Sequence, residues 1–284
     1  MSVLVPALAA CGATSAPSPP ANEQVRLAIE DLAPAANIGH RGTGPTRPGH
    51  PYPENSISSF VAAMEEGADG VELDVEITED GQVVVMHDDT LDRTTDCTGC
   101  VSEATLAEVR ACRLLDGQGQ PTDEHPPTLE EAYAAVPSPG LINVELKVFG
   151  AGCVTPTTDA AALVDAALAE IESLGVANRT FFSSFDSEAA ALVKTREPDW
   201  YSALLYTSVQ DADAALADAL QSGLDAIHPF FLVTPGSVEA ALDEGLQVNV
   251  WTVNGSAEME ANITKGVTSI ITDEPGVLAS IVSD

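Results

Sequence analysis

The chain is 284 residues long and 45% hydrophobic, which is enough to form one large core or two smaller ones. It carries 44 acidic and 11 basic residues, for a formal net charge of −33 and a pI of about 4.1. This charge argues against nucleic acid and anionic membrane surfaces as partners, and no apolar run reaches the roughly 18–20 residues of a transmembrane segment. Such an acidic surface suits a medium of high salt, in which screening weakens the repulsion between like charges.

The first 35 residues differ in composition from the rest of the chain. A short apolar run ends in "LAAC" at Cys11 and is followed by "GATSAPSPPAN", which is rich in Ala, Ser and Pro. Small residues before a cysteine resemble the lipobox of bacterial lipoproteins, although no Lys or Arg precedes them. We therefore expect residues 1–35 to be a signal- or lipobox-like segment followed by a disordered linker. Cys11 is then a candidate lipid anchor, and the protein is expected to be extracytoplasmic, either secreted or attached to the cell envelope.

From residue 36 onward, β-branched runs alternate with Ala-rich segments of helical period. The expected strands are residues 36–40, 70–76, 141–147, 179–183, 201–206, 225–229, 247–253 and 268–272. The expected helices are residues 55–66, 128–136, 158–174, 186–196, 211–221, 235–244, 256–264 and 275–282. Eight such pairs over about 250 residues predict an α/β fold, a single (β/α)8 TIM barrel over 36–284, with a doubly wound open sheet as the alternative.

One segment interrupts this alternation. After the second strand, "GQVVVMHDD" has the pattern of a hairpin return strand, and residues 90–127 show no strong periodicity, so we expect a small insertion there. In an exported chain, the four cysteines beyond Cys11 are expected to form two disulfides, with all three pairings open. Zinc is disfavoured because only one close pair occurs among them. The four are Cys97, Cys100, Cys112 and Cys153.

Charged residues recur at every second position of two neighbouring strands. Glu72 and Asp74 share one face of the second strand, and Glu145 and Lys147 share one face of the next. If the apolar residues between them pack outward on helices, all four charges point into the barrel at its catalytic end. Three carboxylates against one lysine leave an excess of negative charge, which a divalent cation such as Mg²⁺, Ca²⁺ or Mn²⁺ would balance.

The histidines supply candidate proton-transfer groups. His40 and Arg41 end the first strand, and His87 ends the hairpin return strand near the carboxylates. Two histidines at one pocket can serve as general base and general acid. His50 and His125 lie in loops and are expected to be solvated. His228 ends the sixth strand, where it is expected either to pack in the core or to face the pocket.

The motifs also carry a family resemblance. "HRG", "PENSISSF", "EEGADGVELDVEITEDGQVVVMHDDTLDRTT", "NVELK" and "VWTVN…ITDEP" occur in this order over about residues 37–276 and closely resemble the glycerophosphodiester phosphodiesterases. The resemblance implies a TIM barrel that hydrolyses a small glycerophosphodiester to sn-glycerol 3-phosphate and an alcohol. A phospholipase-D-like or phosphoinositide-cleaving relative on the same barrel is the alternative. A glycoside hydrolase is disfavoured because it needs neither the two histidines nor the basic residues.

The resemblance further implies a role for individual residues. It makes His40 and His87 the acid and base, Glu72, Asp74 and Glu145 the ligands of one Ca²⁺ or Mg²⁺ ion, Arg41 and Lys147 the phosphate-binding residues, and Trp251 a neighbour of the substrate pocket. Asp88 and Arg93 are expected to orient these groups, and Asn55 either approaches the site or caps a helix. The loop from His40 to Glu54 is longer than the family's common form. Because loops at this face of the barrel shape the pocket, this difference bears on which substrate the enzyme accepts.

Overall fold

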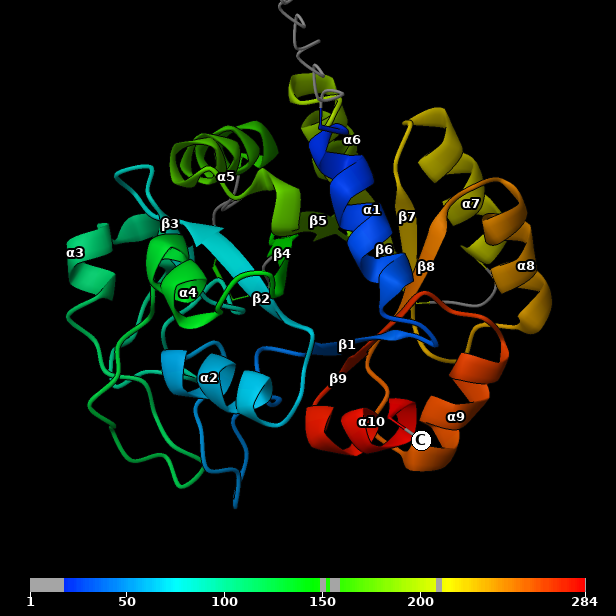
Figure 1. Cartoon of the computed structure of the whole chain (residues 1–284). Helices are drawn as coiled ribbons and strands as arrows, with labels where there is room; N and C mark the ends of the chain where they lie inside the picture. The colour runs from blue at the N-terminus through cyan, green and yellow to red at the C-terminus, as the bar shows by residue number, and fades with distance from the viewer. Residues whose placement is uncertain (1–17, 149–151, 154–158, 208–210, 284) are drawn as a thin grey trace, which may run out of the picture.

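The computed structural model describes residues 18–148, 152–153, 159–207 and 211–283. Within them, eight parallel strands follow one another in the order β1-β9-β8-β7-β6-β5-β4-β2, and β1 also pairs with β2. This last pairing closes the sheet, which confirms the barrel and excludes the open sheet (Figure 1). The lipobox-like segment and Cys11 lie outside the described residues.

Every expected strand and helix is present, with ends that differ by at most three residues. The barrel strands are β1 (Ala36–Gly39), β2 (Gly70–Ile77), β4 (Leu141–Leu146), β5 (Thr180–Ser184), β6 (Tyr201–Tyr206), β7 (Ala226–Pro229), β8 (Gln247–Val250) and β9 (Ser269–Thr272). The helices that follow them are α2 (Ile57–Glu65), α4 (Leu129–Ala135), α5 (Ala160–Leu174), α6 (Ser187–Arg196), α7 (Ala212–Gln221), α8 (Pro235–Asp243), α9 (Ser256–Thr264) and α10 (Pro275–Val282). The predicted hairpin return strand is β3 (Val83–Val85), antiparallel to β2, and a 3-10 turn, η2 (Ala177–Arg179), precedes β5.

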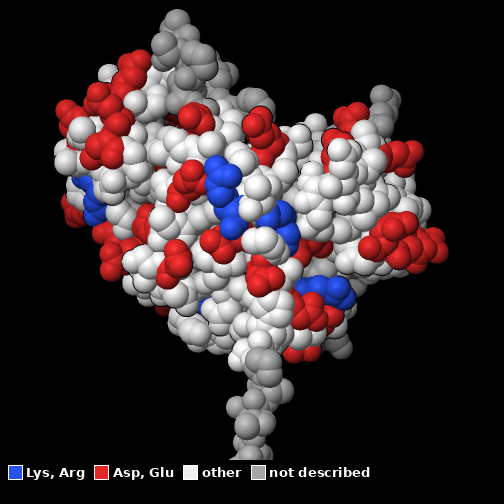
Figure 2. Space-filling model, turned by 90° about the horizontal axis from the view of Figure 1, so that it is seen from above, with Lys and Arg blue, Asp and Glu red and all other residues white. Residues whose placement is uncertain are grey.

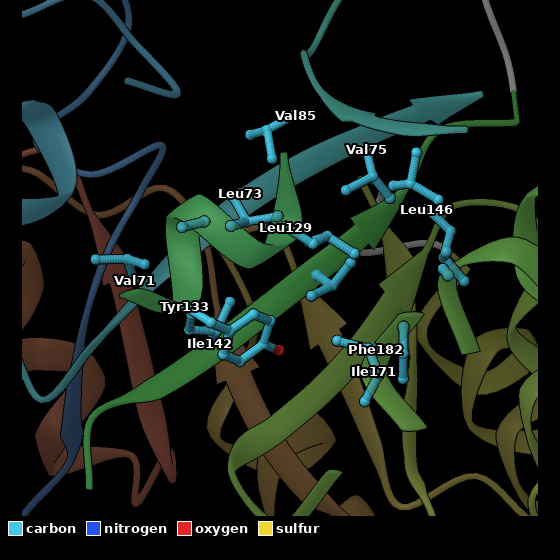
Figure 3. Close-up of a cluster of buried hydrophobic side chains, with 14 of the residues drawn as sticks. Val71, Leu73, Val75, Val85, Leu129, Tyr133, Ile142, Leu146, Ile171 and Phe182 are labelled. Atoms are coloured by element: carbon cyan, nitrogen blue, oxygen red, sulfur yellow. The ribbon is translucent and has the colours of Figure 1, made fainter. Parts of the chain in front are cut away.

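The alternation along β2 decides which side chains reach the barrel interior. Val71, Leu73 and Val75 are fully buried and point outward, where they meet side chains of α4 and α5 in one hydrophobic cluster (Figure 3). Burying each such side chain contributes about 1.5–3 kcal/mol, so a slip of the strand by one residue is strongly disfavoured. The residues between them, Glu72 and Asp74, therefore face inward.

A helix precedes the barrel in the segment expected to be a linker. This helix, α1 (Ala21–Asp31), buries Val25 and Ile29 against the first residues of several strands, at the N-terminal end of the barrel. Figure 1 shows α1 lying across the strands. The expected linker boundary at residue 35 is therefore wrong. Val25 and Ile29 form the one buried i, i+4 apolar pair in this short helix, and the neighbouring segment is rich in Ala and Pro. The helical period was therefore too weak to be recognised in the sequence.

The expected insertion at 90–127 contains no β/α unit. It contains a 3-10 turn, η1 (Val101–Glu103), and one short helix, α3 (Leu106–Val109). Its apolar side chains form a small separate cluster against β3. The expected two disulfides are present, one within the insertion, Cys97–Cys112, and one from the insertion to the loop after β4, Cys100–Cys153.

The surface is acidic, in keeping with the composition. In the view of Figure 2, acidic side chains are spread over the face and basic side chains are confined to a few spots. Among the helices of the described residues, none combines the length and the apolar character that crossing a bilayer requires.

Candidate active site

Three carboxylates meet inside the barrel, as the strand alternation predicts. The register places Asp74 of β2 directly beside Glu145 of β4, with Glu72 one inward position earlier. Glu72 and Asp74 are only 3% and 1% exposed, and one oxygen from each of the three residues lies within 4.8 Å of the others. The group could therefore hold a metal ion.

The electrostatics of this group fit a cation. Burial, together with the charges of Asp74 and Glu145, raises the pKa of Glu72 well above its ordinary value. Burial opposes ionisation of Asp74 too, but His87, Lys147 and Arg41 outweigh it and hold the pKa of Asp74 below its usual range. The Oδ1 atom of Asp74 has no hydrogen-bond partner within the described part of the chain. A largely buried, purely carboxylate set, with one oxygen that lacks a hydrogen bond, suits a hard divalent ion.

Arg41 reaches the carboxylates through both its backbone and its side chain. Its backbone N–H donates to Glu72 (2.9 Å), its guanidinium donates to Glu54 (2.8 Å), and its Nε lies 3.4 Å from Asp74. The backbone contact depends on a left-handed turn, with φ of 49° at Arg41 and 88° at Gly42. A Cβ atom at Gly42 would collide with Ser59, so glycine is required in the "HRG" motif.

Lys147, directly after β4, contacts two of the carboxylates. Its Nζ donates to Glu145 (2.6 Å) and is 3.5 Å from Asp74. Burial alone would lower the pKa of Lys147, but these two carboxylates outweigh it and raise that pKa. An ammonium has three N–H donors, so Lys147 retains donors for a further anion.

His40 is oriented by a residue that the sequence analysis did not assign. Its Nδ1 donates to the Oδ1 of Asp273 (2.7 Å), and Asn254 donates to the other carboxylate oxygen (2.8 Å). Burial raises the pKa of Asp273, but the hydrogen bond and charge of His40, the hydrogen bond from Asn254 and the charge of Arg47 together outweigh it, and the net shift is downward. Because a carboxylate only accepts, the His40 proton is on Nδ1 and its Nε2 is free. The signal for Asp273 was its position directly after the last strand, where catalytic residues of barrels occur.

His87 has a similar partner from its own turn. Its Nδ1 donates to Asp88 (2.6 Å), and Arg93 holds Asp88 from the other side (2.6 Å). Arg93 also donates twice to Glu54, at 2.7 and 2.8 Å. Asp88 thus contacts His87 directly, whereas Arg93 contacts Asp88 and not the histidine. Glu54, quoted in the "PENS" motif but given no role, joins the two arginines of the site.

Asn55 approaches the site and does not cap the helix. Its Nδ2 donates to the Oδ2 of Asp74 (2.9 Å), and its own φ is 55°. The residue that caps α2 is Ser56, whose side chain accepts from the backbone N–H of Ser59. The capping alternative for Asn55 is therefore wrong.

A pocket opens beside these groups. It brings His40, Glu72 and Glu145 together with Trp251, and its other lining residues are Asn143, Ser183, Leu205 and Ile271. The indole of Trp251 donates to the backbone carbonyl of His228 (2.8 Å), and Phe185 and Phe230 pack against its ring at 5.3 and 5.5 Å. Trp251 therefore forms an apolar, rigid wall of the pocket.

The remaining histidines have structural contacts. His228 is fully buried in the barrel, where Asn249 donates to its Nε2 (2.8 Å) and burial lowers its pKa to about 3. His50, expected to be solvated, is half-buried, and its ring nitrogens lie 2.6 and 2.7 Å from two backbone carbonyl oxygens of its own loop. His125 is exposed, as expected, although its Nδ1 contacts the carbonyl of Cys112.

This arrangement can be compared with known proteins. The family model described as the Glycerophosphoryl diester phosphodiesterase family matches residues 40–277. A glycerophosphodiester phosphodiesterase of Caldanaerobacter subterraneus subsp. tengcongensis is 34% identical over 252 residues, which cover 86% of this chain and 96% of the relative. The solved structure of a glycerophosphodiester phosphodiesterase from Agrobacterium tumefaciens has a TM-score of 0.70 at 25% identity, covering 87% of this chain and 99% of that one.

A second solved structure shows the same fold. It is an Oleispira antarctica phosphodiesterase in complex with the product sn-glycerol-3-phosphate, with a TM-score of 0.73, 24% identity and coverage of 90% and 99% of the two chains. The family match spans the barrel from the first catalytic candidate to the last helix. The chain therefore belongs to the glycerophosphoryl diester phosphodiesterase family.

Proposed function

We propose that this enzyme hydrolyses glycerophosphodiesters to sn-glycerol 3-phosphate and an alcohol by acid–base catalysis at His40 and His87. One observation carries the proposal: each of these histidines has a carboxylate on its Nδ1 and lies beside the three-carboxylate group. His40 lines a pocket with Glu72 and Glu145, and the charge of His87 acts on Asp74. The product bound to the Oleispira antarctica phosphodiesterase is the product proposed here.

Glu72, Asp74 and Glu145 would hold one Ca²⁺ or Mg²⁺ ion. When bound, the ion supplies Lewis-acid stabilisation of the negative charge on the phosphate. Arg41 and Lys147 lie at the rim of the same carboxylates, where their unused N–H donors bind phosphate oxygens and stabilise the transition state. These two residues also offset the long-range repulsion between a −33 protein and an anionic substrate.

His40 and His87 divide the proton transfers. With Nδ1 committed to Asp273 and Asp88, each ring presents its Nε2 atom to the reaction. One Nε2 removes a proton from the nucleophile, and the other donates a proton to the departing alkoxide. The carboxylates stabilise the imidazolium that forms after the first transfer and fix the ring in the required tautomer.

Trp251 would position the organic part of the substrate, since its ring packs between two phenylalanines beside His40. We also propose that the enzyme works outside the cytoplasm, because its two disulfides persist in an oxidising compartment. Cys11 would then attach it to the cell envelope through a lipid.

The test is release of sn-glycerol 3-phosphate from glycerophosphocholine by the purified protein with Ca²⁺ or Mg²⁺. We expect EDTA to abolish the release, and His40→Ala and His87→Ala each to lower kcat by about 10²–10⁴-fold. His125→Ala is the matched control, because His125 is exposed and its ring contacts a carbonyl of the insertion.

Two outcomes would contradict the proposal. The first is activity that resists EDTA, or the absence of any activity in the presence of either Ca²⁺ or Mg²⁺. The second is His40→Ala activity equal to that of His125→Ala. Release of choline from intact phosphatidylcholine, faster than from glycerophosphocholine, would instead support the phospholipase-D-like alternative.

A further inference from the structure

Gly152 and Cys153, in the loop after β4, are joined by two connections to the segment that follows His87. The carboxylate of Asp89, two residues after His87, accepts hydrogen bonds from the backbone N–H groups of Gly152 and Cys153, both at 3.0 Å. Cys153 is also disulfide-bonded to Cys100. We call these two connections, Asp89 and Cys100–Cys153, the loop clamp.

The two points of the loop clamp belong to one rigid unit. Thr90 and Cys100 form an isolated β-bridge, and the backbone N–H of Val101 donates to the carbonyl of Asp89 (2.9 Å). Asp89 itself is buried. Gly152 packs so closely on this unit that a Cβ atom there would collide with the side chains of Thr90 and Asp89. Gly152 and Cys153 are therefore docked on the unit through both side-chain and backbone contacts.

The start of the clamped loop lines a second cavity at the active site. Lys147 and Val148 form one side of this cavity, and Phe185, from the loop after β5, forms another. Glu145 lines both this cavity and the pocket that holds His40. A phosphodiester bound at the carboxylates would therefore border both cavities, and we assign one cavity to each of its two ester groups. Gly152 lies only four residues beyond Val148, so the loop clamp holds the chain close to the cavity wall.

We infer that the loop clamp positions the wall of the second cavity and thereby determines which alcohol moieties the enzyme accepts. This inference rests on the proposed function. Asp89 and the Cys100–Cys153 disulfide are positioning residues, because they act on the substrate through the loop and not by direct contact. With the chain held at Gly152 and Cys153, Lys147 and Val148 stay in place and exclude bulky alcohols, whereas without the clamp they can shift away from the cavity.

The second disulfide provides a matched control. Cys97–Cys112 lies within the insertion, and Cys112 packs in the small apolar cluster beside β3. Its removal loosens the insertion without releasing the loop after β4. A general loss of rigidity would follow from removing either disulfide, but a specific change at the cavity would follow only from removing Cys100–Cys153.

The experiment compares the wild type with C100S/C153S, Asp89→Ala and the control C97S/C112S. The substrates are glycerophosphoethanolamine, with a small alcohol, and glycerophosphoinositol, with a bulky one. We expect the ratio of kcat/KM for the bulky over the small substrate to rise about tenfold in C100S/C153S and Asp89→Ala, chiefly through KM. In C97S/C112S the ratio should stay within about twofold of the wild type.

Hydrogen exchange provides a readout that does not require turnover. The amides of Gly152 and Cys153 should exchange faster in C100S/C153S and in Asp89→Ala than in the wild type, and C97S/C112S should match the wild type. Asp89→Ala keeps both disulfides, so it can still be compared with the wild type and with C97S/C112S if C100S/C153S does not fold. An unchanged substrate ratio in an active Asp89→Ala enzyme, or an equal shift in the control, would overturn the inference. A wild type inactive on both substrates would instead overturn the proposed function.

Discussion

Glu54 is the residue that connects the charged groups around the pocket. It is only 2% exposed and accepts hydrogen bonds from both Arg41 and Arg93. Burial alone would raise the pKa of Glu54, but the hydrogen bond from Arg93 and the charge of Arg41 outweigh it, and the net shift is downward. A buried carboxylate between two guanidinium groups is costly to neutralise, because both cations would lose their shared partner.

We expect Glu54→Gln to lower the free energy of unfolding by roughly 3 kcal/mol near neutral pH. Because the folded-state pKa lies below the unfolded value, the Glu54 contribution is fully present above the ordinary pKa of about 4.5. It is lost as the pH falls through the lower, folded-state pKa. The difference between wild type and variant should therefore shrink on acidification, as measured by urea unfolding between pH 7 and 3 in EDTA. A difference that stays constant over this range would show that the charge of Glu54 is not responsible.

At the level of elements, α1 closes the N-terminal end of the barrel, opposite the pocket. Its two buried side chains, Val25 and Ile29, pack with residues at the starts of β1, β4, β6 and β7. The polar face of the same helix is solvated. The helix thus contributes to stability through a narrow apolar stripe and does not reach the catalytic groups.

Ile29→Ala should lower the free energy of unfolding by about 2–4 kcal/mol while kcat and KM stay unchanged, because the cavity it leaves is far from the pocket. Leu27→Ala is the matched control: Leu27 is in the same helix but 43% exposed, and its removal should cost less than about 0.5 kcal/mol. Denaturant unfolding measures both. Equal costs for the two variants would mean that α1 is not packed as described.

For the whole molecule, the net charge of −33 produces a negative electrostatic potential that repels anionic substrates, and the basic residues of the site must compensate for this repulsion. Acidic side chains are scattered over the face seen in Figure 2, whereas the basic residues at the pocket are paired with carboxylates. An anionic substrate is therefore repelled at long range and bound only at close range. Salt shortens the reach of this repulsion, with a Debye length that falls from about 30 Å at 0.01 M to about 8 Å at 0.15 M.

We expect KM for glycerophosphoglycerol, which carries one negative charge, to fall several-fold between about 0.01 and 0.5 M NaCl. Glycerophosphocholine is the control, because its ammonium group makes it neutral overall and its KM should change little. Initial rates over a salt series measure both. An equal response of the two substrates would point to an effect of salt on the protein and not on electrostatic attraction or repulsion.

Much of the site follows from short-range pattern. The two-residue spacing of Glu72 and Asp74, repeated at Glu145 and Lys147, predicts four inward charges on adjacent strands, and the register brings them together. Asp273 and Glu54 were missed as partners for a different reason. Asp273 contacts His40 across 233 positions of sequence, and Glu54 meets Arg93 across 39. No local period encodes such pairings.

The sequence by itself determined the eight β/α units and the side of each strand that faces inward, because strand and helix periods depend only on neighbouring residues. The pairing of β1 with β2, which closes the barrel, came from the tertiary structure. The tertiary structure alone decided the docking of α1, the pairing of Cys100 with Cys153 and the carboxylate partner of His40. It also decided that Asn55 binds Asp74 and does not cap α2. These features depend on which surfaces meet when the barrel closes, and closure brings together residues that no local pattern relates.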